Sequence, residues 1–261
     1  MQILCLDIGS TTQDILLFDT AQSVENSVQL ILPSPTILAA KRIETATARG
    51  DNIVLTGDTM GGGAGTSAIR QHLESGLKIY ATKNAARSFS DDLEEATSWG
   101  IQLISTDEIT HYRNDTIISL TDVDLERLEK ALSSWNITLR PDIVAVAVLD
   151  HGVAPPGESE RLWRFRYLEH LLQANDTLEA FMFSETEAPR HFTRMQAIVR
   201  TIKDNTPLVI MDTGAAAVLG ASFDHVVAPH NNRLVVNLGN SHTLAFNLSG
   251  SRVLGFLEHH T

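Results

Sequence analysis

Short runs of hydrophobic residues separated by polar turns open the chain. Runs at 3–8, 15–18 and 28–32 are rich in β-branched and long apolar residues, and the third one ends at Pro33 and Pro35. Runs of this length and composition are typical of strands, and proline ends such strands because it cannot donate to a sheet ladder. The pattern predicts a three-stranded meander at the start of the chain.

Strand and helix signals alternate in the middle of the chain. Runs at 53–55, 77–80 and 101–104 predict strands, and a glycine-rich stretch at 57–65 joins the first of them to a helix that ends at Gly76. Leucines at helical spacing between 125 and 132 predict another helix, with Asp122 as its N-cap. The almost unbroken apolar run at 143–149 predicts a strand buried on both faces.

The last third of the chain returns to strand signals. A run at 208–211 leads through Asp212 into the small-residue helix AAAVLGA, and a second meander is predicted at 234–238, 243–248 and 253–257. Two meanders flanking a helix-strand alternation predict an α/β fold without tandem repeats.

Composition and charge narrow the classes of partner. The 261 residues are 43% hydrophobic and carry a formal charge of −12, so the average field repels nucleic acid and anionic lipid. A bound phosphate group must then be held locally by backbone amides. Cys5 is the single cysteine, which excludes a disulfide framework. Because no leader or membrane-spanning run is visible, we expect a cytoplasmic protein with no membrane or nucleic-acid partner.

The turn of the first predicted hairpin carries candidate chemistry. Gly9 permits a close backbone approach, and the hydroxyls of Ser10, Thr11 and Thr12 add donors around successive N–H groups. Such turns form nests for phosphate oxygens, and a carboxylate at the strand end, here Asp7, can hold Mg²⁺ through water. A glycine-serine turn in an ordinary hairpin remains the alternative interpretation, because a short glycine motif has low specificity.

Three segments in order resemble the superfamily of actin, Hsp70 and sugar kinases. LDIGSTTQDILLFD resembles its first phosphate hairpin, VIMDTGAAAVLGA its inter-lobe helix, and VVNLGNSHTLAFNL its second phosphate hairpin. The resemblance implies an actin-like (ribonuclease H-like) ATPase fold that binds ATP and Mg²⁺. It divides the chain into a first lobe at 1–211, with an inserted α/β segment at about 50–140, and an inter-lobe helix with the start of a second lobe at 212–261. That second lobe is expected to be reduced or truncated.

The same resemblance assigns roles to individual residues. It implies that the phosphates lie on Gly9, Ser10, Thr11 and Thr12 and on a second set at Gly239, Asn240 and Ser241, with Asp7 holding magnesium. Asp212 matches the catalytic base of some relatives, although an N-cap of the following helix is an equally weighted alternative. Asp150 follows a buried strand, where ligand crevices form, and is a second candidate base. Asn237 replaces the usual aspartate, which weakens the expectation of fast hydrolysis.

Two further clusters have less specific interpretations. The GGGAG stretch at 61–65 lacks the GK[ST] ending of a P-loop, which favours a packing turn over a phosphate site. Three arginines, Arg161, Arg164 and Arg166, could recognise an anionic substrate, but a solvated helix face is the commoner use of such charges. His259 and His260 lack a third ligand, so no metal is assigned to them.

At closer range the chain resembles a family labelled as a pyruvate formate-lyase activating enzyme. The stretches TGDTMGGGAGTSA, LDHGVAPPG and LEHHT carry this resemblance together with the first hairpin. The label implies radical chemistry at a [4Fe–4S] cluster held by three cysteines, and one cysteine excludes that cluster. Three hypotheses remain: an ATPase or phosphotransferase, an ATP-driven switch that activates a protein partner, and an interaction module without catalysis.

Overall fold

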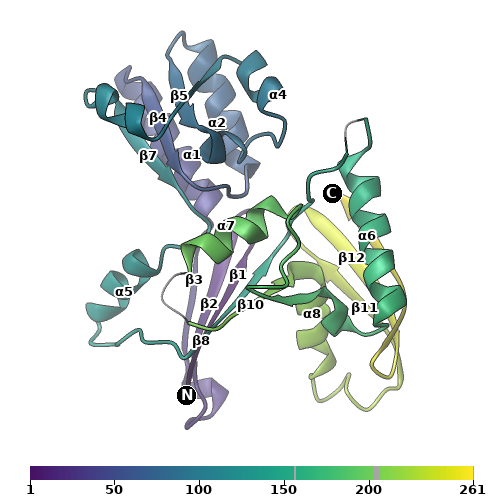
Figure 1. The fold of residues 1–261 in the computed structure, drawn as a ribbon. Helices are drawn as coiled ribbons and strands as arrows, with labels where there is room; N and C mark the ends of the chain where they lie inside the picture. Colours follow the sequence, from purple (N-terminus) through teal and green to yellow (C-terminus); the bar gives the residue numbers. More distant parts are fainter. Residues whose placement is uncertain (156, 203–205, 261) are drawn as a thin grey trace.

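The fold is an α/β arrangement of three sheets with helices between them. The computed structural model describes residues 1–155, 157–202 and 206–260. Figure 1 shows the first sheet in the middle of the molecule, with the second sheet and its helices on one side and the third sheet on another. Among the described residues, no helix combines the length and apolar character needed to cross a membrane.

The first sheet has six strands and mixed directions. Its order is β3-β2-β1-β8-β10-β9, where the meander β1–β2–β3 is antiparallel, β8 and β10 run parallel to β1, and β9 is antiparallel to β10. The strands are β1 (Gln2–Ile8), β2 (Thr12–Asp19), β3 (Val28–Pro33), β8 (Ile143–Val148), β9 (Met182–Ser184) and β10 (Leu208–Asp212).

One face of this sheet is buried under α5 (Leu125–Ser133) and α7 (Thr193–Thr201). Along β8 the buried residues are Val144, Val146 and Val148, whereas the residues between them are only partly buried. The prediction that this strand is buried on both faces was therefore wrong. The opposite face is incompletely covered and forms a shallow apolar groove that includes Cys5 and Ala145.

The second sheet is entirely parallel and has its own core. Its order is β6-β5-β4-β7, and its elements are α1 (Pro35–Arg49), β4 (Ile53–Gly57), α2 (Gly63–Glu74), β5 (Ile79–Thr82), α3 (Lys83–Ala86), α4 (Leu93–Ser98), β6 (Ile101–Ile104) and β7 (Thr116–Leu120). The core residues of this unit form a cluster separate from that of the first sheet. The signal for α1 was present in the sequence, because Ser34 caps it, Pro35 opens it and Gly50 ends it with φ 74°.

The third sheet is an antiparallel meander at the end of the chain. It consists of β11 (Asn232–Leu238), β12 (His242–Ser249) and β13 (Arg252–His260). Its inner face packs against α6 (Glu160–Ala174) and α8 (Thr213–Ser222) through a third apolar cluster. The remaining elements are short 3-10 helices at Val24–Asn26, Asp107–Tyr112 and Leu178–Phe181.

One capping prediction was wrong in a way that affects the site. The N-cap of α5 is Asp124, whose side chain accepts a hydrogen bond from the Arg127 amide at 2.9 Å. Asp122, the predicted cap, instead binds Arg194 with Oδ2 2.5 Å from Nε and Oδ1 2.9 Å from Nη2. Two aspartates two positions apart precede the helix, and their spacing alone does not distinguish the cap from the buried partner of a distant arginine.

Candidate functional site

Two hairpin turns, one from each meander, lie face to face. The Ser241 hydroxyl lies 2.8 Å from the Ser10 hydroxyl, and the Asn240 side-chain amide donates to the Thr11 hydroxyl. These contacts join the β1–β2 turn to the β11–β12 turn across 231 residues of sequence. The structure therefore brings together the two sets of residues proposed from the sequence for phosphate contacts.

The two turns have the same internal geometry. The Gly9 amide donates to the Thr12 carbonyl at 2.9 Å, and the Gly239 amide donates to the His242 carbonyl at the same distance. A Cβ atom at Gly9 would lie 2.9 Å from the Thr12 oxygen, and one at Gly239 would lie 3.0 Å from the His242 oxygen. A side chain at Gly9 would force the first turn to shift, and one at Gly239 would be tightly packed, so sterics favour glycine at the first position of each turn.

A cavity of about 570 Å³ opens beside the two turns, and we call it the central cavity. Besides both turns, its lining includes the carboxyl ends of β1 and β8, the glycine loop at 61–63 and the segment 87–91 of the second-sheet unit. Its volume falls within the range of small-molecule and cofactor sites, roughly 300–1,000 Å³. The first sheet, the third sheet and loops of the second-sheet unit all contribute residues to it, so the site needs the whole fold.

Asp7 lies at the mouth of the first turn and lines this cavity. Its Oδ1 accepts a hydrogen bond from the Thr213 hydroxyl at 2.7 Å, and Asp14 is its partner across the β1–β2 ladder. Partial burial raises the pKa of Asp7, the Thr213 hydrogen bond lowers it, and the charge of Asp14 raises it. Two carboxylates directly opposite on one hairpin repel each other, and a divalent cation would relieve that repulsion.

Asp150 is a buried carboxylate on the cavity wall. Its Oδ1 accepts from the Gly152 amide and its Oδ2 from the Met195 amide, both at 2.9 Å. Burial raises its pKa to about 6, although those two amides and the charge of Arg194 act in the opposite direction. A carboxylate with a pKa near neutrality is suited to accept and return a proton.

Asp212 is held by two other interactions. Its Oδ1 accepts from the amides of Gly214 and Ala215 at the start of α8, which confirms the predicted N-cap. Its Oδ2 binds Nη2 of Arg164 at 2.6 Å. Among the described residues, Thr213 lines the central cavity, whereas the neighbouring Asp212 does not. A role for Asp212 as a base remains a prediction, and it would require breaking one of these contacts.

Arg164 is the centre of a buried ionic network that was not predicted from the sequence. Its side chain is 2% exposed and contacts Asp212, Glu258 at 3.2 Å and the Asp150 carbonyl at 2.8 Å. Glu258 in turn lies 3.0 Å from Nδ1 of His242, in the second turn. Burial alone would raise the pKa of Glu258, but the His242 hydrogen bond and the charge of Arg164 lower it to about 2. The network links α6, α8, β13 and the second turn.

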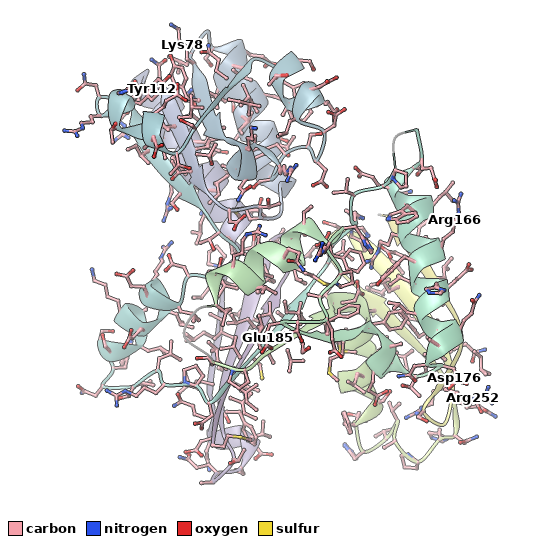
Figure 2. All side chains as sticks on the ribbon, in the orientation of Figure 1. Lys78, Tyr112, Arg166, Asp176, Glu185 and Arg252 are labelled. Atoms are coloured by element: carbon pink, nitrogen blue, oxygen red, sulfur yellow. The ribbon has the colours of Figure 1, made fainter. Side chains whose placement is uncertain are left out.

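The arginines of α6 therefore differ in role. Arg166 is exposed and pairs with Glu158 at 2.7 Å, and Figure 2 shows it on the outer side of the helix. Arg164 faces inward and serves packing and charge neutralisation. The two arginines are two positions apart and therefore lie on opposite faces of α6, and Arg164 shares its face with the buried Leu168. The distant carboxylates of Asp212 and Glu258 neutralise its buried charge.

His151, which follows Asp150 in the sequence, and Arg194 of α7 complete the wall. The His151 ring lies against the His242 ring with centroids 5.8 Å apart, and His151 lines the cavity. Loss of hydration within the surrounding protein and the positive charge of Arg164 lower the pKa of His151 to about 4. The His151 side chain is therefore neutral near pH 7. Arg194, already bound to Asp122, donates from Nη1 to the Leu149 carbonyl at 2.8 Å.

The glycine loop at 61–63 lies close to other parts of the protein. A Cβ atom at Gly62 would lie 2.4 Å from the Ser88 carbonyl oxygen, and one at Gly61 would lie 2.9 Å from the Arg194 guanidinium. This supports the packing-turn interpretation. The loop also borders the central cavity, so the same tight packing sets one wall of the site.

Comparison with known proteins gives a family but no curated relative. No curated protein matches this chain. A family model described as "Putative pyruvate format-lyase activating enzyme (DUF1786)" matches residues 60–261, a range that includes the second turn, Asp150, Asp212 and the Arg164 network. Because the match covers most of the chain, the protein belongs to this family.

Proposed function

We propose that this protein binds a nucleoside triphosphate, in the first instance ATP, with its phosphates in the central cavity against the two hairpin turns. The observation that carries the proposal is the pair of matching turns, each closed by a glycine amide and joined by the Ser10–Ser241 contact. Backbone N–H groups and hydroxyls on two sides suit a polyphosphate, and local donors are needed in a chain of charge −12.

The sheet order supports an actin-like arrangement. An antiparallel meander followed by two parallel strands forms the first sheet, and a helix after β10 leads to a second meander. In the resemblance described above, these elements carry the first phosphate hairpin, the inter-lobe helix and the second phosphate hairpin. The second-sheet unit, which begins after β3, corresponds to the inserted α/β segment.

Asp7 and Asp150 have separate roles in this proposal. Asp7, with Asp14 opposite, fits Mg²⁺, which proteins bind through one or two carboxylates together with substrate phosphates. The bound ion would neutralise charge on the phosphates. Asp150 would accept a proton from water or from an acceptor hydroxyl, which makes an ATPase or phosphotransferase the best-supported activity.

The iron–sulfur chemistry suggested by the family description does not fit these residues. Cys5 is a free cysteine on β1, and a [4Fe–4S] cluster needs three or four thiolates. Among the described residues, no group of three or more His, Cys, Asp or Glu side chains is arranged to hold a metal. We therefore derive no step through such a cluster.

Thermal unfolding with and without Mg-ATP tests the proposal. A ligand at one hundred times its Kd stabilises the folded protein by about 2.7 kcal/mol, and we expect an upward shift of Tm. Asp7→Ala should remove most of the magnesium-dependent part of the shift. Asp19→Ala is the matched control, because Asp19 lies at the far end of the same hairpin with an exposed side chain.

A second pair of variants tests the turn itself. Gly9→Ala places a Cβ atom 2.9 Å from a backbone oxygen and should open the first turn, whereas Gly220 in α8 has no atom within 4 Å of that position. We expect Gly9→Ala to abolish the shift and Gly220→Ala to retain it. Absence of any shift in the parent protein at millimolar Mg-ATP would refute the proposal.

A further inference from the structure

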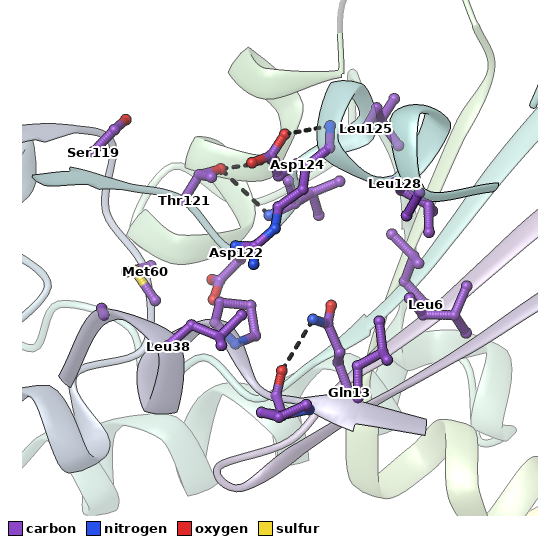
Figure 3. Close-up of a pocket in the computed structure, with 18 of the residues that line it drawn as sticks. Leu6, Gln13, Leu38, Met60, Ser119, Thr121, Asp122, Asp124, Leu125 and Leu128 are labelled. Atoms are coloured by element: carbon purple, nitrogen blue, oxygen red, sulfur yellow. Dashed lines mark hydrogen bonds between the residues drawn. The ribbon is translucent and has the colours of Figure 1, made fainter. Parts of the chain in front are cut away.

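A second cavity lies where the second-sheet unit joins the first sheet, and we call it the junction cavity. Its volume is about 210 Å³. The chain crosses between the two units at 33–35 and again at 120–124, and both crossings border the cavity. Figure 3 shows its wall, with Leu6 and Leu128 on the first-sheet side and Leu38 and Met60 on the other.

Two of the uncharged polar side chains in the wall, those of Gln13 and Thr121, already make hydrogen bonds within the protein. The Gln13 side-chain amide donates to the Pro33 carbonyl at 3.1 Å, and the Thr121 hydroxyl donates to the Val123 carbonyl at 2.8 Å (Figure 3). The rest of the wall is mainly aliphatic, from Ile15, Leu32, Leu125 and their neighbours. An apolar ligand group would therefore enter at little cost in free energy, because it displaces water without breaking these protein hydrogen bonds.

The two arginines that line the cavity form no ion pair within the described parts of the chain. Asp122 is bound by Arg194, and Asp124 caps α5. Arg42 of α1 and Arg127 of α5 both line the cavity and are exposed, and no carboxylate in the described parts of the chain pairs with either guanidinium. Two unpaired arginines beside an apolar cavity match an anionic group attached to an apolar body.

We propose that the junction cavity binds a small amphipathic anion, a linear carboxylate whose chain fills the cavity and whose head is bound by Arg42 and Arg127. A volume of 210 Å³ equals about seven water molecules at about 30 Å³ each, which suits a chain of roughly eight carbons. Guanidinium recognises carboxylate through two parallel hydrogen bonds. The site is separate from the turns, so it stands independently of nucleotide binding.

Isothermal titration of the full chain with three probes tests the composition of the ligand. Octanoate has both the tail and the head, 1-octanol has the tail alone, and acetate has the head alone. We expect octanoate to bind with a Kd below about 1 mM, and both other probes to bind at least tenfold more weakly. No binding of octanoate, or equal binding of octanol or acetate, would overturn the proposal.

Variants then place the ligand in this cavity. Arg42→Gln and Arg127→Gln should each raise the Kd for octanoate about tenfold, because each removes a charge-assisted hydrogen bond. Lys41→Gln is the matched control, since Lys41 neighbours Arg42 on α1, is exposed and does not line the cavity. Ala131→Trp, at an exposed lining position, should block binding without disturbing the core. Unchanged affinity in Ala131→Trp, or in both arginine variants, would place octanoate elsewhere and refute the assignment.

Discussion

Replacing Arg164 by methionine should destabilise the protein strongly. The side chain of Arg164 is 2% exposed, and those of its partners Asp212 and Glu258 are 6% and 7% exposed. Methionine keeps much of the apolar stem but leaves two buried carboxylates without their cation. Breaking a buried ion pair by removing one partner costs about 3–5 kcal/mol, chiefly because the remaining charge stays desolvated.

The pKa of Glu258 gives a second estimate of how much the ionic network contributes to the free energy of unfolding. Despite the opposing effect of burial, His242 and Arg164 lower this pKa from 4.5 to about 2, which corresponds to about 3 kcal/mol of stability through proton linkage. That stability is fully present above pH 4.5 and is lost as the pH falls towards 2. Because Arg164 supplies part of the effect, the difference between the parent and Arg164→Met should shrink as the solution is acidified below pH 4.5.

Urea unfolding followed by circular dichroism, at pH 7 and at pH 4, measures this difference. Hydrogen exchange at α8 and β13 locates it, because the partners Asp212 and Glu258 lie at those elements. Arg166→Met is the matched control on the same helix, with an exposed partner, and should change stability by less than about 0.5 kcal/mol. A cost for Arg164→Met as small as the control, or a gap that does not narrow on acidification, would refute the reasoning.

Variants of Asp150, Asp124 and Asp122 test the proposed base, the helix cap and the ion pair. If Asp150 is the base, ATP turnover should rise as the pH increases through about 6, because the deprotonated carboxylate is the active form. Asp150→Asn should lower turnover at least about 100-fold and remove this pH dependence. Both effects are measured by the rate of phosphate release between pH 5 and 8. Asp124→Ala should cost about 1 kcal/mol in urea unfolding through loss of the α5 cap. Asp122→Ala should cost more, about 3 kcal/mol, because it leaves the mostly buried Arg194 without its carboxylate, and equal costs for the two variants would contradict the assignment of cap and ion pair.

The local periodicity of the chain predicts much of the strand content. The hairpin at 2–19 and the meander at 232–260 were recognised because alternating apolar runs flank glycine turns, a signal contained within about ten residues. The helix α1 was missed although Ser34, Pro35 and Gly50 mark both of its ends. Its interior is rich in alanine and threonine, so its apolar stripe is weak.

The ionic network could not be predicted by such local signals. Arg164 is separated from Asp212 by 48 residues and from Glu258 by 94, and nothing in the sequence of α6 identifies these two carboxylates as its partners. Partner choice depends on which strands and helices pack together, which is a tertiary property. The same holds for the central cavity, whose walls come from the first sheet, the third sheet and loops of the second-sheet unit, although the residues of its two turns were identified individually.

The two turns are alike in backbone but unequal in charge, and this asymmetry bears on what the site can do. Asp7 and Asp14 face each other across the first hairpin, whereas the corresponding positions of the second hairpin are Asn237 and Leu244. Of these two pairs of facing residues, only the pair on the first hairpin carries negative charge. A divalent cation bound there would approach the phosphates from one side, and the neutral side chains of Asn240 and Ser241 would contact them from the other. This arrangement favours tight binding, while turnover depends on whether Asp150 can reach the attacking group.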